Sequence, residues 1–452
     1  MSITINSFKA YDIRGQIPND LNPDIAYRIA NATVEFLGAK TMVLGRDIRL
    51  SSGEFADAVA AGLRDAGADV LDIGVGGTEI VYFATGDLQA DGGIMVTASH
   101  NPADYNGLKL VRQHARPISG DTGLVDIRKM AERDSRQRAD APGVREEIDI
   151  SARYIERLLS FVDLAALSKL RIVSNAGNGG AGMTLDKLEP HLPFEFVKVH
   201  HEADGTFPNG VPNPMLEENR ASTVDAIRKN KADFGIAWDG DFDRCFFFDE
   251  NGRFIEGYYM VGLLAQAQLA NNPGAAIVYD PRLTWSTIEI VKQFGGKPVQ
   301  SKSGHSFMKE VMRKEDALYG GEMSAHHYFR DFFYCDSGMI PWLLVAQLVS
   351  AGDATLSELV DDRMEKFPAS GEINRKVADA GKAIQVIRDR YAGGAKAIDE
   401  TDGVSLEFDD WRFNLRSSNT EPVIRLNVES RGDAKLMRKR TGEILALLDQ
   451  LA

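Results

Sequence analysis

The residues best suited to chemistry lie in an acidic turn near the middle of the chain, Asp239-Gly240-Asp241-Phe242-Asp243-Arg244. Carboxylates at positions i, i+2 and i+4 of a tight loop can all face one hard cation. Three carboxylates this close together also repel one another unless a positive charge neutralises them. We therefore predict that Asp239, Asp241 and Asp243 are ligands of a divalent metal ion.

Two alternatives to this metal site remain. An EF-hand loop is the first, because Glu250 falls at its twelfth position. However, Arg244 stands where the sharp turn of an EF-hand requires glycine, and the flanking ranges Phe234–Ala237 and Cys245–Phe248 have the composition of strands rather than helices. A solvated acidic turn is the second alternative.

A second polar turn follows an expected strand at Gly93–Thr97 and reads Thr97-Ala98-Ser99-His100-Asn101-Pro102. Such a turn can present one hydroxyl while backbone N–H groups hold an anion. Ser99 is therefore the candidate nucleophile or phosphate carrier, and His100 and Lys109 are candidates for charge stabilisation or proton transfer. A seryl phosphate carries nearly two negative charges, which suits a bound divalent ion. The alternative is an Asn-Pro turn whose polar groups are incidental.

A third segment, residues 416–422, reads Arg-Ser-Ser-Asn-Thr-Glu-Pro and lies between two expected strands. Guanidinium, hydroxyl and amide donors in so short a segment are the groups that hold a phosphate. Arg425 could add a second guanidinium from the following strand. A polar hairpin connection is the alternative.

A fourth segment, Gly320–His327, combines glycines with Glu322 and Ser324, which are two residues apart and point the same way in extended chain. A carboxylate beside a hydroxyl suits recognition of neighbouring sugar hydroxyls. The adjacent His326 and His327 point apart, so a zinc pair is not favoured. Upstream, residues 302–305 read Lys-Ser-Gly-His and set a cation and an imidazole around a glycine. The alternative for His305 is a histidine of the hydrophobic core.

One glycine-rich segment resembles a different kind of site. Gly177–Gly182 follows an expected strand, matches G-x-G-x-x-G, and has Glu202 about 20 residues further on. A dinucleotide site is therefore formally possible, and with it an NAD-dependent dehydrogenase. Because a lone glycine match is weak, we interpret these glycines as tight packing between a strand and a helix.

Apolar strands that alternate with helices must position these segments. Thr41–Leu44 is an expected strand followed by a helix at Glu54–Ala66, and Ala275–Tyr279 is a strand followed by a helix at Ser286–Phe294. This alternation predicts parallel sheets with crossover helices. Near the C-terminus the pattern changes to a hairpin and a final amphipathic helix.

A chain of 452 residues exceeds a single hydrophobic core, so several domains are expected. The charged segment Lys129–Glu147 indicates the first boundary. We predict α/β domains at 1–150, 151–256 and 257–367, carrying the serine turn, the acidic turn and the Glu322 segment in that order. A smaller α+β domain at 368–452 carries the arginine segment.

The net charge limits which classes of partner are expected, and the cysteine content indicates the compartment. The chain has 52 basic and 66 acidic residues, and the net charge of −14 disfavours nucleic acid or an anionic membrane as a partner. Two cysteines, Cys245 and Cys335, make no disulfide framework and indicate a reducing cytoplasm. Met1–Gly15 has no apolar stretch typical of a secretory signal, and the apolar run Met339–Val349 is half a membrane span, so it predicts a buried helix.

The four segments, in this order, resemble the α-D-phosphohexomutase superfamily, and most nearly its bacterial phosphomannomutase/phosphoglucomutase branch. The opening Phe8–Gly15 is also similar to that family's first motif. The resemblance covers essentially the whole chain. It implies four domains, the three α/β domains having mixed, largely parallel sheets, around a central active-site cleft.

The resemblance also assigns roles to individual residues. Ser99 matches the serine that carries the phosphoryl group and lends a phosphoserine oxygen to Mg²⁺, with Asp239, Asp241 and Asp243 as the other ligands. The implied catalytic set is Ser99, His100, Lys109, His305 and Arg14. The implied substrate-binding set is Tyr11, Arg244, Arg282, Lys302, Gly304, Glu322, Ser324, Arg416, Ser418, Asn419, Thr420 and Arg425. Arg282 falls where some relatives have lysine.

The implied reaction interconverts hexose 6-phosphate and hexose 1-phosphate, of mannose or glucose, through a phosphoserine and a hexose 1,6-bisphosphate that also serves as activator. Sugar phosphates are then the partners, and a monomer or weak dimer is expected. A phosphoglucosamine mutase is the alternative within the family. A non-catalytic sugar-phosphate sensor is a further alternative, but such a protein is expected to lack Ser99 or one of the metal carboxylates.

Overall fold

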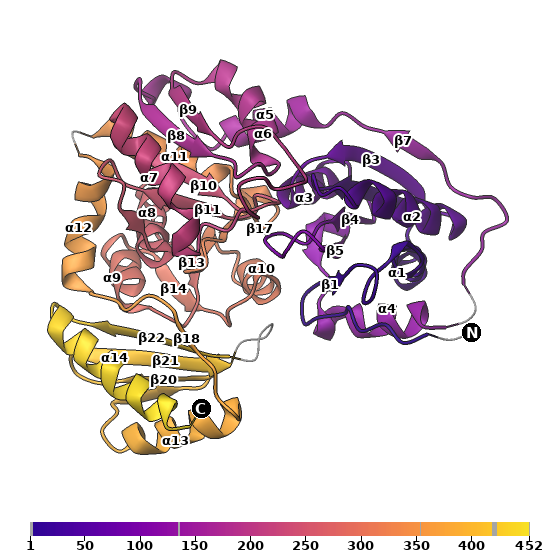
Figure 1. Cartoon of the computed structure of the whole chain (residues 1–452). Helices are drawn as coiled ribbons and strands as arrows, with labels where there is room; N and C mark the ends of the chain where they lie inside the picture. Colours follow the sequence, from indigo (N-terminus) through magenta and orange to yellow (C-terminus); the bar gives the residue numbers. More distant parts are fainter. Residues whose placement is uncertain (1–2, 134–135, 353, 418–422, 452) are drawn as a thin grey trace. The chain divides into compact units, whose positions relative to one another are not determined.

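A computed structural model describes residues 3–133, 136–352, 354–417 and 423–451 (Figure 1). The chain forms two compact units. Unit 1 comprises Met1–Phe254 and His326–Asp353, and unit 2 comprises Ile255–Ala325 and Ala354–Ala452. The candidate residues therefore fall into two groups, one in each unit.

The first sheet of unit 1 has the strand order β1-β5-β4-β2-β3-β7, with β6 paired to β5. Its core is parallel, because β2 pairs in parallel with both β3 and β4, whereas β5 is antiparallel to β4 and β1. The strands are β1 (Ile13–Gln16), β2 (Thr41–Arg46), β3 (Asp69–Val75), β4 (Gly92–Val96), β5 (Tyr105–Arg112), β6 (Arg116–Pro117) and β7 (Arg145–Glu147). The predicted strands at Thr41–Leu44 and Gly93–Thr97 are thus confirmed.

Helices cover this sheet and begin where local chemistry favours them. In α1, Asn22 caps the N-terminus by accepting a hydrogen bond from the Ile25 N–H, and Gly38 ends the helix with φ +61°. Apolar residues of α1 and α2 share a core with the sheet through side chains such as Ile29 and Phe55. The helices are α1 (Pro23–Leu37), α2 (Ser52–Asp65), α3 (Thr78–Asp87) and α4 (Leu124–Ala131).

The second sheet of unit 1 has the order β12-β11-β10-β8-β9. β10 is parallel to β8 and antiparallel to β11. The elements are β8 (Arg171–Asn175), β9 (Glu195–Val199), β10 (Phe234–Trp238), β11 (Cys245–Phe248), β12 (Phe254–Ile255), α5 (Ser151–Leu159), α6 (Ala181–Leu188) and α7 (Ala221–Asn230). The acidic turn therefore connects two antiparallel strands, which removes the EF-hand alternative because that motif needs flanking helices.

The C-terminal segment of unit 1 contains β16 (His327–Phe329), β17 (Cys335–Asp336) and α11 (Ile340–Ala351). The apolar run that predicted a buried helix forms α11, whose residues from Ile340 to Ala346 are buried. No single helix of the described chain is long and apolar enough to cross a membrane. The helices Ile340–Ala351 and Leu356–Lys366 have the necessary length and composition only when they are taken together as a bent pair.

Unit 2 contains two kinds of sheet. β13 lies between β14 and β15 and pairs in parallel with both. The second sheet has the antiparallel order β18-β22-β21-β20-β19. The strands are β13 (Ala276–Tyr279), β14 (Lys297–Gln300), β15 (Tyr319–Gly321), β18 (Ile373–Arg375), β19 (Ala397–Asp399), β20 (Val404–Glu407), β21 (Trp411–Ser417) and β22 (Ile424–Ser430).

Helices α13 (Ala380–Ala392) and α14 (Ala434–Asp449) pack on this antiparallel sheet (Figure 1). Their buried residues Ile387 and Ile444 share a hydrophobic core with Phe413 and Leu426 of the sheet. The predicted hairpin near the C-terminus and the amphipathic helix after it are confirmed as β21, β22 and α14. The helices of unit 2 are α8 (Gly257–Ala270), α9 (Trp285–Gln293), α10 (His305–Lys314), α12 (Leu356–Lys366), α13 (Ala380–Ala392) and α14 (Ala434–Asp449).

Candidate active site

The serine turn follows the end of β4 and holds Ser99 in a strained conformation. Ser99 is buried and has φ +50°, a left-handed value that a non-glycine residue adopts only when its surroundings enforce it. Arg49 supplies part of that enforcement by donating hydrogen bonds from Nη2 to the carbonyl oxygens of Ser99 (2.9 Å) and Asn101 (2.6 Å). The Ser99 N–H donates to Thr97 Oγ1 at 2.8 Å.

The acidic turn packs directly against this serine. A Cβ atom at Gly240 would lie 2.6 Å from the Ser99 carbonyl oxygen, so only glycine permits this approach. All three aspartates are buried, and Ser99 Oγ donates a hydrogen bond to Asp239 Oδ2 at 2.8 Å. The two segments that the sequence marked separately are thus brought together within unit 1.

Arg244 and His100 surround the serine hydroxyl. Arg244 donates from Nε and Nη2 to Asp239 Oδ2, at 2.9 and 2.6 Å. His100 Nδ1 lies 3.0 Å from Ser99 Oγ and 2.5 Å from Arg244 Nη2. Burial and the Arg244 guanidinium lower the pKa of His100 well below its usual value, so the imidazole is neutral. Because a guanidinium only donates, Nδ1 must be the accepting nitrogen and Nε2 carries the proton.

Lys109 lies between the other two aspartates. Its ammonium donates to Asp241 Oδ2 at 2.7 Å, Asp243 Oδ2 at 2.6 Å and Thr78 Oγ1 at 3.2 Å. Burial would lower the pKa of Lys109, but the two carboxylates outweigh it and raise that pKa. The lysine thus already offsets part of the negative charge of the acidic turn.

The remaining oxygens of the turn fit a metal ion. Burial raises the pKa of Asp241, but Lys109 more than reverses this and lowers it, whereas burial and the neighbouring Asp241 carboxylate raise the pKa of Asp243. Among the residues that the structure describes, Oδ1 of Asp241 and Oδ1 of Asp243 are buried and accept no hydrogen bond. One carboxylate oxygen from each of the three aspartates lies within 4.8 Å of the others. Such a set of hard oxygen donors suits Mg²⁺.

Two further residues of unit 1, Arg14 and His326, adjoin this centre. Arg14 donates from Nη1 to Asn101 Oδ1 in the serine turn at 2.6 Å, and Tyr11 is half-buried just before β1. His326 Nε2 lies 3.7 Å from Asp243 Oδ1 and 4.0 Å from Asp336 Oδ2. Our site prediction omitted His326, because its distance of some 80 residues from the acidic turn hides the contact.

The glycine-rich segment Gly177–Gly182 packs against the acidic turn. A Cβ atom at Gly179 would lie 3.0 Å from the Gly240 carbonyl oxygen, and the Gly180 N–H donates to that same oxygen at 3.3 Å. Gly182 in α6 lies against the backbone of His201, where a Cβ would come within 2.2 Å of a carbonyl oxygen. Close backbone packing therefore accounts for these glycines without a dinucleotide.

In unit 2, Arg282 connects the sugar-recognition candidates. Its guanidinium pairs with Asp280 at 2.8 Å and lies 3.7 Å from Glu322 Oε1 and 3.4 Å from Ser324 Oγ. Glu322 also accepts a hydrogen bond from the Gly304 N–H at 2.7 Å, which joins the segment at 302–305 to the Glu322 segment.

Lys302 and His305, in the same segment, lie in different settings. His305 begins α10 directly after Gly304, which has φ +120°. Lys302 is exposed, with its ammonium 5.7 Å from the centre of the Phe307 ring.

A carboxylate that the sequence did not single out organises the arginines of unit 2. Glu372 lies 3.0 Å from Arg416 Nη2, 3.3 Å from Arg282 Nη1 and 3.2 Å from Arg425 Nη1. Burial raises the pKa of Glu372, but the three guanidinium groups outweigh it and bring the pKa to about 2. Glu372 stands in no recognisable motif, and only the fold assembles the arginines around it. Of the predicted phosphate-binding residues, Ser418, Asn419 and Thr420 lie outside the described residues.

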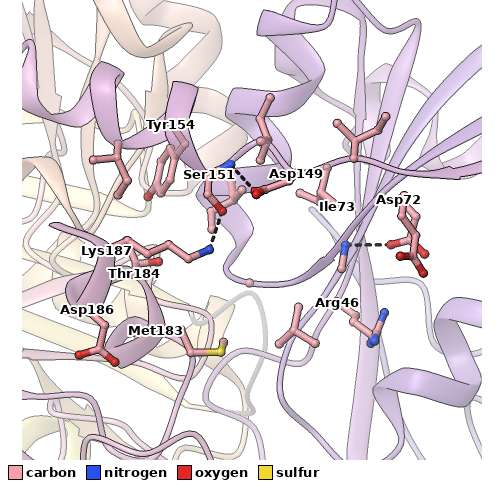
Figure 2. Close-up of a pocket in the computed structure, with 18 of the residues that line it drawn as sticks. Arg46, Asp72, Ile73, Asp149, Ser151, Tyr154, Met183, Thr184, Asp186 and Lys187 are labelled. Atoms are coloured by element: carbon pink, nitrogen blue, oxygen red, sulfur yellow. Dashed lines mark hydrogen bonds between the residues drawn. The ribbon is translucent and has the colours of Figure 1, made fainter.

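A cavity of about 980 Å³ in unit 1 belongs to a different place in the fold. It opens beside the end of β3, α5 and α6, and Figure 2 shows Arg46, Tyr154, Met183 and Lys187 around it. Ser99 and the three aspartates are not among its lining residues. This cavity is therefore not where the candidate chemistry is assembled.

Comparison with known proteins identifies the class to which this site belongs. Four models that describe phosphoglucomutase/phosphomannomutase match consecutive parts of the chain: alpha/beta/alpha domain I at residues 6–138, domain II at 152–252, domain III at 256–367, and the C-terminal domain at 372–446. The chain therefore belongs to the phosphoglucomutase/phosphomannomutase family. The predicted fold class and family resemblance are confirmed.

Individual relatives cover the whole length. The chain is 59% identical over 446 residues to "Phosphohexose mutases" of Xanthomonas campestris pv. campestris (strain B100), with 99% of this chain and 100% of the relative covered. It is 58% identical over 453 residues to a phosphomannomutase of Escherichia coli (strain K12), with 99% of each covered. A crystal structure of a phosphoglucomutase/phosphomannomutase family protein from Burkholderia thailandensis has a TM-score of 0.89 at 32% identity, covering 98% of this chain and 97% of that one.

Proposed function

We propose that this protein is a phosphohexomutase that interconverts hexose 6-phosphate and hexose 1-phosphate, with mannose or glucose as the sugar. One observation carries the proposal: the Ser99 hydroxyl donates to the first of three buried aspartates, two of which retain unsatisfied buried oxygens. A serine beside a cation site suits a seryl phosphate, because its charge would be uncompensated elsewhere. The phosphomannomutase relatives support the same reaction.

In the proposed reaction Ser99 carries the phosphoryl group. A hydroxyl oxygen of the bound hexose monophosphate attacks the phosphorus, the bond from phosphorus to Ser99 Oγ breaks, and the electron pair stays on Oγ. The product of this half-reaction is a hexose 1,6-bisphosphate, whose other phosphoryl group then returns to Ser99. His305 is proposed to accept the proton of the attacking hydroxyl, and the Lys109 ammonium, which Asp241 and Asp243 hold in its charged form, to donate a proton to Ser99 Oγ.

The charges around Ser99 support transfer rather than simple binding. Arg244 lies against both Asp239 and His100, so its guanidinium is positioned beside the serine oxygen. Mg²⁺ held by Asp239, Asp241, Asp243 and a phosphoserine oxygen would supply electrostatic stabilisation of the transferring phosphoryl group. His100, neutral and hydrogen-bonded to Arg244, would hold that guanidinium beside Ser99 Oγ. Arg14 would hold the serine turn through Asn101.

Unit 2 is proposed to bind the part of the substrate that does not react. Glu322 and Ser324 would bind neighbouring sugar hydroxyls, and Arg416 with Arg425 would bind the phosphate that is not transferred. Because either phosphate of the bisphosphate must be accepted, the sugar has to bind in two orientations. The proposed substrate-binding set is completed by Tyr11, Arg282, Lys302, Gly304, Ser418, Asn419 and Thr420.

The four-domain division at 1–150, 151–256, 257–367 and 368–452 is part of the same proposal. The positions of the four matching family models support it. Each proposed domain then contributes one of the four chemical segments.

A coupled assay tests the function. Purified protein with Mg²⁺ and glucose 1,6-bisphosphate is expected to convert mannose 1-phosphate or glucose 1-phosphate to the 6-phosphate. Glucosamine 1-phosphate turning over faster than both would instead favour a phosphoglucosamine mutase. Turnover of none of the three sugars would contradict the proposal.

A further inference from the structure

We propose that Glu79 is a positioning residue for the acidic turn and thereby sets the affinity of the protein for Mg²⁺. The inference rests on the proposed function, because the turn it positions is the proposed metal site. Glu79 lies in the first turn of α3, is completely buried, and is absent from the predicted site.

The Glu79 carboxylate connects three segments of unit 1 that are far apart in the sequence. Oε1 accepts hydrogen bonds from the hydroxyl of Tyr154 in α5 and from Ser337 Oγ at 2.8 Å. Oε2 accepts from the N–H groups of Gly338 at 2.5 Å and Met339 at 3.2 Å. One side chain thus holds the beginning of α3, the helix α5 and residues 337–339 together.

Two of these segments contact the acidic turn from different sides. From α3, Thr78 donates from its backbone N–H to the Asp241 carbonyl oxygen at 3.1 Å and from Oγ1 to Asp241 Oδ2 at 2.5 Å. Gly77 is so close that a Cβ atom there would lie 2.6 Å from the same carbonyl oxygen. Thr78 is therefore flanked by Gly77, which contacts the turn, and by Glu79, whose hydrogen bonds fix the beginning of the helix.

Residues 337–339 contact the other side of the turn. A Cβ atom at Gly338 would lie 2.4 Å from the Phe242 carbonyl oxygen and 3.1 Å from that of Arg244. The Gly338 carbonyl oxygen in turn accepts a hydrogen bond from the Trp238 indole N–H at 2.8 Å, at the residue before the turn. Phe242 has φ +43°, so the turn needs support from its surroundings to keep its conformation.

Within the part of the chain that the structure describes, the hydrogen bonds of Glu79 go to Tyr154 and residues 337–339 and not to the three aspartates, so its effect must pass through Thr78 and Gly338. Partners of this kind orient metal ligands, and their loss typically costs about 10- to 100-fold in metal affinity. Burial outweighs the four hydrogen bonds and raises the pKa of Glu79 to about 8, so its neutral form is accessible. A glutamine has the same shape, keeps an acceptor for the N–H groups, and can donate to the two hydroxyl oxygens.

The test compares Glu79→Ala, Glu79→Gln and a matched control, Glu54→Ala. Glu54 is also in the first turn of a helix of unit 1, but it is exposed. Isothermal titration with Mg²⁺ alone should show the affinity of Glu79→Ala reduced by about 10-fold or more. Glu79→Gln should recover most of it, and Glu54→Ala should match the wild type. The KM for the sugar phosphate, which depends on unit 2 in the proposed function, should be unchanged.

Hydrogen exchange of the peptide that spans residues 239–245 gives a second readout without metal. Faster exchange in Glu79→Ala, reversed in Glu79→Gln, supports the positioning of the acidic turn by Glu79. A wild type that binds no Mg²⁺ would overturn the proposed metal site and the effect of Glu79 on Mg²⁺ affinity, whereas the exchange result tests the positioning role separately. Folded Glu79→Ala with wild-type Mg²⁺ affinity and wild-type exchange would overturn the inference. Should Glu79→Ala not fold, Glu79→Asp keeps the charge, shortens the reach by one methylene, and is expected to show a smaller loss in both measurements.

Discussion

The acidic turn of unit 1 and the arginine cluster of unit 2 are built with opposite charge. In the first, Lys109 and Arg244 pair with three carboxylates, those of Asp239, Asp241 and Asp243. In the second, Arg416, Arg425 and Arg282 share the carboxylate of Glu372, and Arg282 also pairs with Asp280. An excess of carboxylates leaves room for a cation and an excess of guanidinium groups leaves room for an anion. A metal-dependent reaction on a phosphorylated sugar needs both.

The largest expected effect tests the serine beside the first cluster. Ser99→Ala should lower kcat by at least about 1,000-fold, or roughly 4 kcal/mol, because no other group accepts the phosphoryl group in the proposed reaction. The coupled assay with hexose 1,6-bisphosphate present measures it, and the exposed Ser160→Ala is the control. Activity near that of the wild type would remove Ser99 from the mechanism.

The next effect tests whether the first cluster holds a cation. Dialysis against EDTA should abolish activity and added Mg²⁺ should restore it, since the buried carboxylates then lose and regain their counter-charge. Asp241→Asn should shift the Mg²⁺ concentration for half-maximal activity upward by about 10-fold or more. Full activity after complete removal of divalent ions would show that Lys109 and Arg244 alone neutralise the carboxylates and that the reaction needs no metal ion.

A smaller effect tests whether the second cluster holds an anion. Arg416→Ala should raise the KM for the sugar phosphate by about 10-fold, because a charge-assisted hydrogen bond contributes roughly 1.5–3 kcal/mol. The rate at saturation should change less. The exposed Arg390→Ala in α13 is the matched control. If both variants have the same KM, the phosphate is bound elsewhere.

A separate effect, on stability rather than on activity, follows from the pKa of Glu372. A carboxyl group whose pKa falls from 4.5 to about 2 on folding stabilises the folded state above pH 4.5 and loses that contribution as the pH falls toward 2. This contribution is roughly 3 kcal/mol at neutral pH. The difference in the free energy of unfolding between wild type and Glu372→Gln, measured in denaturant, should therefore shrink as the pH is lowered. A difference independent of pH would mean that Glu372 is not charged in the folded protein.

Much of the fold could be predicted because local patterns carry it. The strand at Thr41–Leu44, the hairpin of β21 and β22, and the buried helix α11 follow from apolar periodicity that acts over a few residues. The flanking strands of the acidic turn were likewise evident, and they decide against an EF-hand. What periodicity does not specify is which strands become neighbours across a sheet, since that depends on residues far apart in the chain.

The same division applies to the site. The chemical groups could be recognised from the sequence, because carboxylates at alternate positions, a serine in a polar turn and an arginine-rich hairpin are local patterns. The fold is needed to bring Ser99 Oγ to Asp239, to place Lys109 between Asp241 and Asp243, and to gather three arginines around Glu372. Glu79 and His326 could not be found from the sequence either. The partners of Glu79 lie about 75 to 260 residues away in the sequence, and the partner of His326 lies about 80 residues away. Burial, not spacing, makes those contacts strong.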